Sequence, residues 1–481
     1  MAEILSDAGL TYNDVLLVPK RSSILSRKDV STETKLSRNI KLSIPVVSAN
    51  MDTVTESEMA IAMARCGGIG IIHRFLTIEE GVAEVLRVKR LEALNVENPY
   101  NLNPEISLGE ARVKMREWGV SGVLVVKEDR TLVGILTARD VLFETDASRR
   151  ISELMTAREK LITASYGIKL EDAKAILHKH RIEKLPLVGP DGKLAGLITS
   201  KDIKKIEENS FATKDEKGRF RVGAAVGVKD DEERVDALVS AGVDALVIDI
   251  AHGHSDLVIA EIRRIKNKYP NVEVIAGNVA TAEATSDLIE AGADAVKVGV
   301  GPGAFCTTRI VAGAGFPQLS AVMQCVRAAN GSGVSIIADG GIQHPGDMSK
   351  AIAAGASSVM VGALLGGTDE APGVTMIRNG RKYKISRGMA SFGANMGRRA
   401  NGNRPADNSA VIDYVPEGVE AMVPYRGTVA EVIQQLVGGL RSGMSYSNAR
   451  TIVELWQNAA FVKMTSAGLR ESFSHDVEVI Q

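Results

Sequence analysis

Short runs of consecutive apolar residues recur along the chain, and most are followed by a segment with helical periodicity. Several runs are rich in Val and Ile and lack the apolar–polar alternation of a half-exposed strand. Strands that are buried on both faces have this pattern, as in a parallel sheet. The runs that we predict to be strands are Ile44–Ser48, Ile69–His73, Arg221–Val226, Ala245–Asp249, Val274–Asn278, Ala295–Gly299, Ser335–Asp339 and Ser358–Gly362.

The segments between these runs carry apolar residues at helical spacing, as in Asp256–Lys268 and Thr281–Ala291. A chain that alternates strands with helices builds a parallel sheet covered by helices. Eight such units predict an α/β fold of the closed (β/α)8, or TIM-barrel, type. An open doubly wound sheet is the structural alternative.

Two similar units interrupt this order. Leu132–Asp140 in the first unit and Leu194–Asp202 in the second share their Gly, Thr and Asp at a fixed offset. A short strand precedes each of these segments, at Gly122–Val126 and Leu185–Val188, and a helix precedes that strand. A repeat at a fixed offset indicates a duplicated structural module.

The sequence therefore predicts a barrel with an insert. We expect residues 1–91 and 208–481 to form the barrel, and the insert to consist of about 92–150 and 151–207. One segment of the barrel, about 390–427, is rich in Gly, Asn, Arg and Pro and lacks periodicity. A long irregular segment in a compact enzyme is usually a lid or disordered.

The composition indicates a globular protein without a strong global charge. Hydrophobic residues make up 45% and charged residues 24%, and 58 Lys and Arg nearly balance 59 Asp and Glu. We therefore expect neither nucleic acid nor an anionic membrane as a partner. No apolar stretch approaches the roughly 18–20 residues of a membrane-spanning helix. The N-terminal segment, which contains Asp7 and Asp14, does not resemble a signal peptide.

The sequence contains three cysteines, and none has the spacing of a disulfide framework or a zinc site. This favours a reducing compartment, so we expect a cytoplasmic protein. Cys66 and Cys325 lie within helical patterns and are expected to be structural. Cys306 differs, because it follows a predicted strand at the carboxyl edge of the barrel, where active sites form.

The loop Gly299–Arg309 contains three glycines in its first five residues and then presents Cys306. The glycines permit close backbone approach to a ligand. Two hydroxyl residues and Arg309 follow the cysteine, and we expect these surroundings to favour a thiolate.

This loop, GVGPGAFCTTR, followed by GAGFPQ, resembles the active-site loop of IMP dehydrogenases and GMP reductases. The resemblance extends along the whole catalytic part of the chain. The further matching motifs are NMDTV at Asn50–Val54, DIAHGHS at Asp249–Ser255, AGNVAT at Ala276–Thr281, ADGGI at Ala338–Ile342, RGMAS at Arg387–Ser391, VPEGVE at Val415–Glu420 and RES at Arg470–Ser472.

The resemblance implies a role for individual residues. Cys306 would attack C2 of the purine ring of the nucleotide, and Thr308 would assist proton transfer. Asp339 would bind the ribose hydroxyls, and Gly341 and Gly362 would lie in phosphate-binding loops. The other residues expected at the substrate are Met51, Met389 and Glu417, and those expected at the cofactor are Asp249, Asn278 and Gly299. A strand-end aspartate could instead cap the next helix.

The resemblance also implies NAD as cofactor and a monovalent cation, K⁺. The carbonyls of Gly301, Gly303 and Cys306 match the cation site of the family. Glu471, Ser472 and Phe473 match the part of that site that a neighbouring subunit contributes. A homotetramer, possibly an octamer, is expected for the same reason.

The two enzymes of the family differ in one step. Water hydrolyses the adduct in the dehydrogenase, and the adduct forms with release of ammonia in the reductase. In typical dehydrogenases an Arg-Tyr pair on a mobile flap, which corresponds here to the segment of about 390–427, activates the water. Here Arg404 occupies the arginine position, but Pro405 replaces the tyrosine. Ala304, Ala363 and Ser386 also depart from the usual residues near the phosphate.

Other features resemble dehydrogenases, namely the flap length, the VPEGVE motif, Arg387 and the tandem insert. We therefore predict an IMP dehydrogenase that oxidises IMP to XMP with NAD. A GMP reductase, which converts GMP to IMP with NADPH, is the alternative. A non-catalytic nucleotide sensor is a third hypothesis.

The insert resembles a tandem pair of CBS modules, a family that binds adenine or guanine nucleotides. The resemblance places Thr137, Asp140, Thr199 and Asp202 at ribose and phosphate contacts. A structural role is the alternative, in which each Thr caps a helix and each Asp lies in its first turn.

Overall fold

The computed structural model describes residues 4–5, 9–90, 99–201, 203–204, 211–228, 232–400, 414–474 and 477. The chain divides into two compact units, each with its own hydrophobic core. One unit consists of Met1–Leu91, Phe211–Asp215 and Phe220–Gln481, and the other of Glu92–Ser210 and Glu216–Arg219.

The larger unit is built on a closed barrel of eight parallel strands, so the predicted TIM-barrel fold is confirmed. Each of the eight predicted runs coincides with or overlaps one barrel strand. In order around the barrel, the strands are β13 (Gly223–Val226), β14 (Ala245–Asp249), β15 (Glu273–Val279), β16 (Ala295–Val298), β17 (Ser335–Asp339), β18 (Ser358–Val361), β4 (Val46–Ser48) and β5 (Ile69–Ile72).

Successive residues of each strand point alternately into the barrel and out towards the helices. In β14, Ala245 and Val247 pack in the inner cluster, whereas Leu246 and Ile248 pack in the outer one. Both faces are thus buried, which explains why the strands read as unbroken apolar runs. It also means that Asp249 lies on the inner face, because it follows Val247 by two positions.

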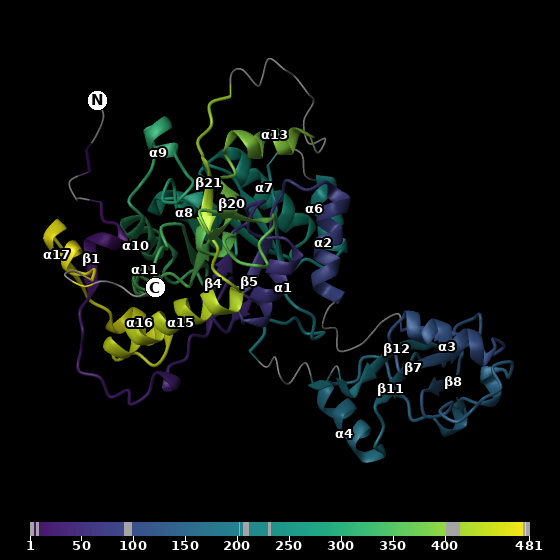
Figure 1. Ribbon diagram of the computed structural model, residues 1–481. Coiled ribbons are helices and arrows are strands. Elements are labelled where there is room, and N and C mark those ends of the chain that lie inside the picture. The colour runs from purple at the N-terminus through teal and green to yellow at the C-terminus, as the bar shows by residue number, and fades with distance from the viewer. Residues whose placement is uncertain are drawn as a thin grey trace. The chain divides into compact units, whose positions relative to one another are not determined.

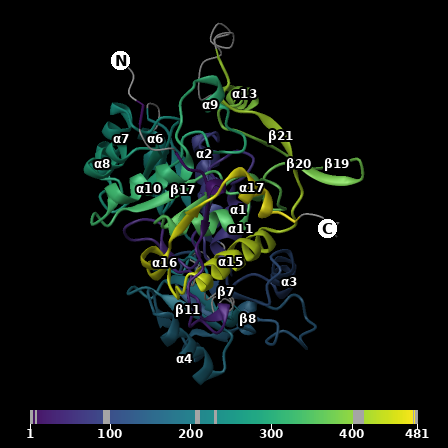
Figure 2. The same cartoon turned by 90° about the vertical axis from the view of Figure 1, so that its left-hand side faces the viewer.

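Helices surround the barrel on its outer side, as Figures 1 and 2 show. Helix α8 begins with a side-chain cap, because Thr281 accepts a hydrogen bond from Ala284 N, and α15 begins with a reciprocal capping box. The helices are α1 (Ser57–Arg65), α2 (Ile78–Arg90), α6 (Glu232–Ser240), α7 (Asp256–Lys268), α8 (Ala282–Glu290), α10 (Gln318–Ala329), α11 (Pro345–Ala353), α15 (Val429–Tyr446), α16 (Ile452–Asn458) and α17 (Ser466–Glu471).

A hairpin of β2 (Thr34–Lys35) and β3 (Lys41–Leu42) closes the amino end of the barrel. Its Leu36 and Leu42 pack against the inner cluster. Asn39 donates to Glu273, at the start of β15, over 2.7 Å. The carboxyl end of the barrel is therefore the open end.

The segment 390–427 is more regular than its sequence suggests. Helix α13 (Phe392–Ala400) and strand β21 (Glu420–Pro424) occupy its two sides. Strand β21 pairs with β20 (Arg381–Arg387), which also pairs with β19 (Thr375–Arg378). The expectation of a wholly irregular segment was wrong for these described parts, because β21 gains its order from pairing with a strand outside the segment. Residues 401–413 lie outside the described residues.

The smaller unit contains the two repeats. The first has β6 (Asn101–Leu102), α3 (Leu108–Glu117), β7 (Gly122–Val126), β8 (Leu132–Thr137) and β9 (Thr156–Ala157), and the second has β10 (Ala164–Ser165), α4 (Leu170–His180), β11 (Lys184–Val188) and β12 (Leu194–Thr199). The helix expected after Thr137 does not form, because the residues that follow are in turns. Asp140 closes that turn by accepting from Thr137 N and Oγ1, each at 2.7 Å.

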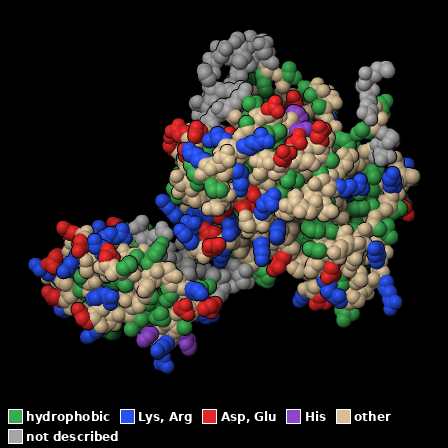
Figure 3. Space-filling model, turned by 180° about the vertical axis from the view of Figure 1, so that it is seen from behind, with side chains coloured by type: hydrophobic (Ala, Val, Ile, Leu, Met, Phe, Trp, Pro, Cys, Tyr) green, Lys and Arg blue, Asp and Glu red, His purple; other side chains and the backbone are tan. Residues whose placement is uncertain are grey.

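The surface shows no segregation of charge on the face drawn in Figure 3, where Lys and Arg side chains are interspersed with Asp and Glu. This mixture agrees with the near balance of 58 basic and 59 acidic residues. Among the described residues, no helix combines the length and the apolar character that crossing a membrane requires.

Candidate active site

A cavity of about 330 Å³ lies at the carboxyl ends of the barrel strands. Parallel strands bring their carboxyl ends together, so residues far apart in sequence meet here. Most of the residues singled out in the sequence line it. They are Met51, Asp249, Asn278, Gly299, Gly301, Gly303, Cys306, Thr308, Asp339, Gly341, Gly362, Met389 and Glu417.

Three described residues that we predicted for the cation site, Glu471, Ser472 and Phe473, are not part of this lining. Glu471 ends α17, and Ser472 and Phe473 follow it. The ring of Phe473 lies 6.5 Å from that of His344, between ring centroids. Arg404 lies outside the described residues.

The Cys306 thiol donates a hydrogen bond of 3.2 Å to the hydroxyl oxygen of Thr308, the first residue of the short helix α9 (Thr308–Val311). Cys306 N donates to Gly303 O at 3.0 Å, which turns the loop back on itself. Thr307 N donates to Glu417 O at 2.9 Å, so the segment before β21 holds the loop from the other side. The cysteine is thus presented to the cavity by two separate segments.

Arg309 binds the backbone around the cysteine loop. Its guanidinium donates to the carbonyls of Val300 and Phe316 and thereby ties the start of the loop to the segment that follows it. Arg309 lies on α9, whose first turn directs the side chain back towards Gly301. Its role is to shape the loop.

The other two cysteines are packed into the structure. Cys325 is fully buried in α10, and burial raises the pKa of its thiol to about 11. Cys66 caps the end of α1, and burial likewise raises its pKa. Both are therefore protonated and unreactive at neutral pH.

A buried cation lies at the centre of the cavity floor, and the sequence analysis missed it. The ammonium of Lys297 donates to Asp249 Oδ1 and Asp339 Oδ2, both at 2.7 Å, and to Asn278 Oδ1 at 2.5 Å. Its side chain is only 2% exposed. The available signal was a lysine in the middle of an otherwise apolar strand, Ala295–Val298.

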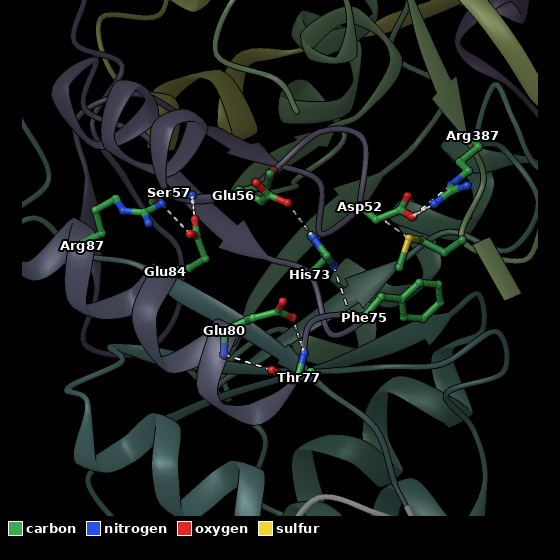
Figure 4. A network of polar contacts seen from close by, with 12 residues as sticks. Asp52, Glu56, Ser57, His73, Phe75, Thr77, Glu80, Glu84, Arg87 and Arg387 are labelled. Carbon is green, nitrogen blue, oxygen red and sulfur yellow. Dashed lines mark hydrogen bonds and ion pairs between the residues drawn. The ribbon is translucent and has the colours of Figure 1, made fainter. Parts of the chain in front are cut away.

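Two methionines form part of the cavity wall, and an ion pair fixes them. Arg387, at the end of β20, donates from Nε to Asp52 Oδ2 at 2.9 Å (Figure 4). Asp52 N lies 3.4 Å from Met389 Sδ, and Asp52 directly follows Met51. The pair therefore joins the loop after β4 to the base of the flap.

The end of β5 is fixed by a histidine. His73 Nδ1 accepts from Phe75 N at 3.2 Å, and its Nε2 lies 3.5 Å from Glu56 Oε1 (Figure 4). The tautomer that fits these contacts carries its proton on Nε2. This turn places Arg74 and Phe75 on the cavity lining, with Arg74 near Asp249.

The side of the cavity formed by Gly341 and Gly362 has little room for side chains. A Cβ on Gly341 would meet the Tyr12 ring at 3.2 Å, and one on Gly362 would meet Met51 Sδ at 3.1 Å. The buried Ser386 shares a hydrogen bond of 3.0 Å with Thr53 and does not line the cavity. Ala304 and Ala363 do line it.

The smaller unit has a cavity of its own, of about 340 Å³. Thr137 and Asp140 of the first repeat line it together with Arg181 and Lys184 of the second. Thr199 ends β12 and is not among the lining residues, and Asp202 lies outside the described residues.

The sequence matches the IMP dehydrogenase / GMP reductase domain family over residues 9–475. Among curated proteins, it is 55% identical to inosine-5'-monophosphate dehydrogenase of Nitrosopumilus maritimus, over 98% of both chains. It is also 55% identical to the enzyme of the same name from Aquifex aeolicus, over 98% of this chain and 96% of the relative.

Solved structures give a second comparison. The structure is similar to that of a variant GMP reductase from Trypanosoma brucei in complex with guanosine 5'-monophosphate, with a TM-score of 0.88, 49% identity and 98% coverage of each chain. The GMP reductase of the same organism in complex with guanosine 5'-triphosphate matches with a TM-score of 0.77 and 45% identity, over 96% of this chain and 98% of that one.

Proposed function

The chain belongs to the IMP dehydrogenase / GMP reductase family, and we propose that it is an IMP dehydrogenase, which oxidises IMP to XMP with NAD. The observation that carries this proposal is the Cys306 thiol, 3.2 Å from Thr308 in a cavity that also contains Asp339. The curated relatives, which carry the name of this enzyme at 55% identity, support it.

The residues of the chain suggest how the reaction proceeds. The Cys306 sulfur adds to C2 of the purine ring, and the adjoining ring nitrogen takes up the electron pair of the C2–N bond together with a proton. Thr308, whose oxygen already accepts the thiol hydrogen bond, relays that proton by receiving the one from the thiol and passing on its own. Asp339 accepts from the ribose hydroxyls, and the loops at Gly341 and Gly362 bind the phosphate. This phosphate is remote from the reacting carbon, so its binding energy serves to fix the orientation of the ring.

The cofactor side of the cavity is expected at Asp249, Asn278 and Gly299. When bound, NAD supplies the acceptor for the hydride that leaves C2. The lining fits a nicotinamide riboside, because it offers the carboxylate of Asp249 and the ring of Phe75 on one side. The guanidinium of Arg74 suits the adjoining phosphate.

The loop also fits part of a site for K⁺. Backbone carbonyls are the ligands that this ion accepts in proteins, and Gly301, Gly303 and Cys306 supply three within one turn. Gly303 O already accepts from Cys306 N and keeps a second lone pair. We propose that Glu471, Ser472 and Phe473 of a neighbouring subunit complete the site, in a homotetramer or octamer.

Hydrolysis of the adduct requires an activated water. We propose Arg404 for this task, with Glu417 at the rim of the cavity, where its backbone already holds the Cys306 loop. Because Pro405 takes the place of the usual tyrosine, Arg404 would act without that partner.

GMP reductase is the second candidate, and two observations favour it. Pro405 stands where dehydrogenases carry the tyrosine, and solved structures at 45–49% identity are GMP reductases. An ultraviolet assay separates the activities. Absorbance of the reduced nicotinamide should rise with IMP and NAD; a fall with GMP and NADPH would establish the reductase, and no change with either pair would refute both and favour a sensor.

We also propose that the smaller unit is a tandem CBS pair that binds adenine or guanine nucleotides. Its cavity combines Thr137 and Asp140 with basic residues of the second repeat, which suits a ribose and phosphates. The boundaries near 92, 150 and 207 are proposed with it. We further propose that the protein is cytoplasmic, and its free cysteines are consistent with a reducing compartment.

A further inference from the structure

Lys297 occupies the third position of β16, between two valines that face the outer helices. Ala295 packs in the inner cluster, so the alternation of the strand directs Lys297 into the barrel. Asp249 and Asp339 reach the same interior from β14 and β17, by the same alternation after Val247 and Ile337. Three charged side chains thus meet on the inner face at the carboxyl end.

All three hydrogen-bond donors of the Lys297 ammonium have acceptors within this cluster. An ammonium has three N–H donors, and those of Lys297 go to Asp249, Asn278 and Asp339. The amide of Asn278 is also saturated, because Nδ2 donates to Gly299 O at 2.8 Å and to Asp339 Oδ2 at 2.9 Å. Among the described residues, Asp339 Oδ1 accepts no hydrogen bond and remains available to a ligand.

The opposite charges of Lys297 and the carboxylates stabilise each other's ionised forms. Burial by itself would lower the pKa of Lys297, but the two carboxylates raise it well above its usual value. Burial opposes ionisation of Asp249 too, and the ammonium nevertheless holds the pKa of that carboxyl below its usual range. The lysine is therefore a permanent cation that keeps Asp249 ionised in a buried place.

We propose that Lys297 is a positioning residue that couples the substrate and cofactor subsites, by holding the substrate-side Asp339 and the cofactor-side Asp249 on one ammonium. The inference rests on the proposed function, which assigns a nucleotide to each carboxylate. A ligand that binds one of the two carboxylates changes how strongly Lys297 binds the other. Binding at the two subsites is therefore linked through this residue, and linkage is reciprocal.

The first test removes the charge of the carboxylate on the cofactor side. In Asp249→Asn, the ammonium shifts towards Asp339, withdraws that carboxylate from the ribose and weakens it as an acceptor. Affinity for IMP, measured by calorimetry without any cofactor, should fall at least about fivefold. In the Lys297→Met background the same change, measured at about pH 8 where both carboxylates are ionised, should leave IMP affinity unaltered, because the link is gone.

The second test removes the cation. In Lys297→Met, two carboxylates share a buried site, so the pKa of one of them rises and it takes up a proton as pH falls. Arg74 lies beside Asp249 and the Tyr12 phenol lies near Asp339, and the Cys306 thiol and Glu417 line the same cavity. IMP affinity relative to wild type should therefore drop at least about fivefold more at about pH 5.5 than at about pH 8.

Lys89 provides a matched control. Its ammonium is 3% exposed and pairs with Asp244 at 2.6 Å and Asp215 at 3.1 Å. Asp244 directly precedes β14, so this cluster lies at the amino end of the barrel, opposite the cavity. Lys89→Met makes the same chemical change and should alter thermal stability, without changing IMP affinity or its pH dependence relative to wild type.

The outcomes separate the inference from the proposed function. Unaltered IMP affinity in Asp249→Asn, or a pH dependence of Lys297→Met that matches wild type, would overturn the coupling. If wild type binds GMP in preference to IMP, the proposed dehydrogenase is wrong and the same titrations are made with GMP. Should Lys297→Met fail to fold, Asp249→Asn in the wild-type background decides the question alone.

Discussion

A methyl group added at Gly299 would test whether the geometry of the Cys306 loop controls catalysis. Gly299 follows β16 with a φ of +154°, a value that L-residues rarely adopt. A Cβ built there would lie well inside 3.0 Å of Asp339 O. That carbonyl cannot easily move away, because Gln318 Nε2 donates to it at 3.0 Å and to Val298 O at 2.9 Å.

The size of the effect follows from this clash. To reach normal van der Waals contact, Gly299 and Asp339 must move apart by about 1 Å. A misplacement of about 1 Å at a catalytic centre costs roughly 10²-fold in rate. Backbone strain adds about 1–3 kcal/mol of destabilisation. We therefore expect Gly299→Ala to fold with a lowered melting temperature and to lose roughly 10²-fold in kcat.

The assay is steady-state turnover with IMP and NAD, with thermal melting measured alongside. Gly438→Ala is the control, because a Cβ at this position in α15 meets open space. It should keep full activity and gain roughly 0.5–1 kcal/mol of stability, as Gly→Ala does within a helix. Turnover of Gly299→Ala close to that of wild type would refute the claim that the packing of Gly299 against Asp339 sets the catalytic geometry.

The remaining predictions concern the nucleophile, the flap and the insert. Cys306→Ala should abolish turnover but keep nucleotide binding in calorimetry; appreciable turnover would rule out the covalent mechanism. Arg404→Gln should slow adduct hydrolysis and leave hydride transfer fast, so that stopped-flow absorbance shows a burst of reduced cofactor, whereas equal loss in both steps would count against this base. Replacing residues 92–207 with a short linker should preserve catalysis and remove any response to ATP or GTP. The double change Asp140→Ala with Asp202→Ala should weaken calorimetric binding of these nucleotides, and unchanged affinity would favour a purely structural role.

The barrel could be predicted because burial dictates its pattern. All eight strands are covered on both faces, and this leaves apolar runs at a regular spacing that few other folds produce. The helices α7 and α8 were predicted to within a residue at each end, since their caps and apolar faces are local features. Local rules and the global fold agree in these elements.

The features that the sequence did not reveal depend on specific hydrogen-bond partners, some of them far away in the chain. Strand β21 depends on β20, and no pattern within the segment 390–427 indicates its partner. The turn after Thr137 replaces the expected helix because Asp140 satisfies the backbone N–H of Thr137 itself. Arg309 follows Cys306 by three positions, and its guanidinium donates to the carbonyls of Val300 and Phe316. Its place near the cysteine in the sequence did not indicate these backbone partners.

A comparison of the buried Lys297 with the buried Lys89 shows why Lys297 is tied to ligand binding and not only to stability. A buried ion pair seldom contributes more stability than well-packed apolar residues would. At the amino end, both oxygens of Asp244 are used by the protein, since Oδ1 accepts from Arg221 and Oδ2 from Lys89 and Val222 N. At the carboxyl end, Asp339 lines the cavity and keeps one oxygen without a protein partner among the described residues. The cluster at the amino end is closed by protein partners, and the cluster at the carboxyl end is open to a ligand. This difference matches the division of such folds into a stabilising face and a catalytic face. A bound ribose would supply the partner that this carboxylate lacks, and Lys297 holds the carboxylate in place until then.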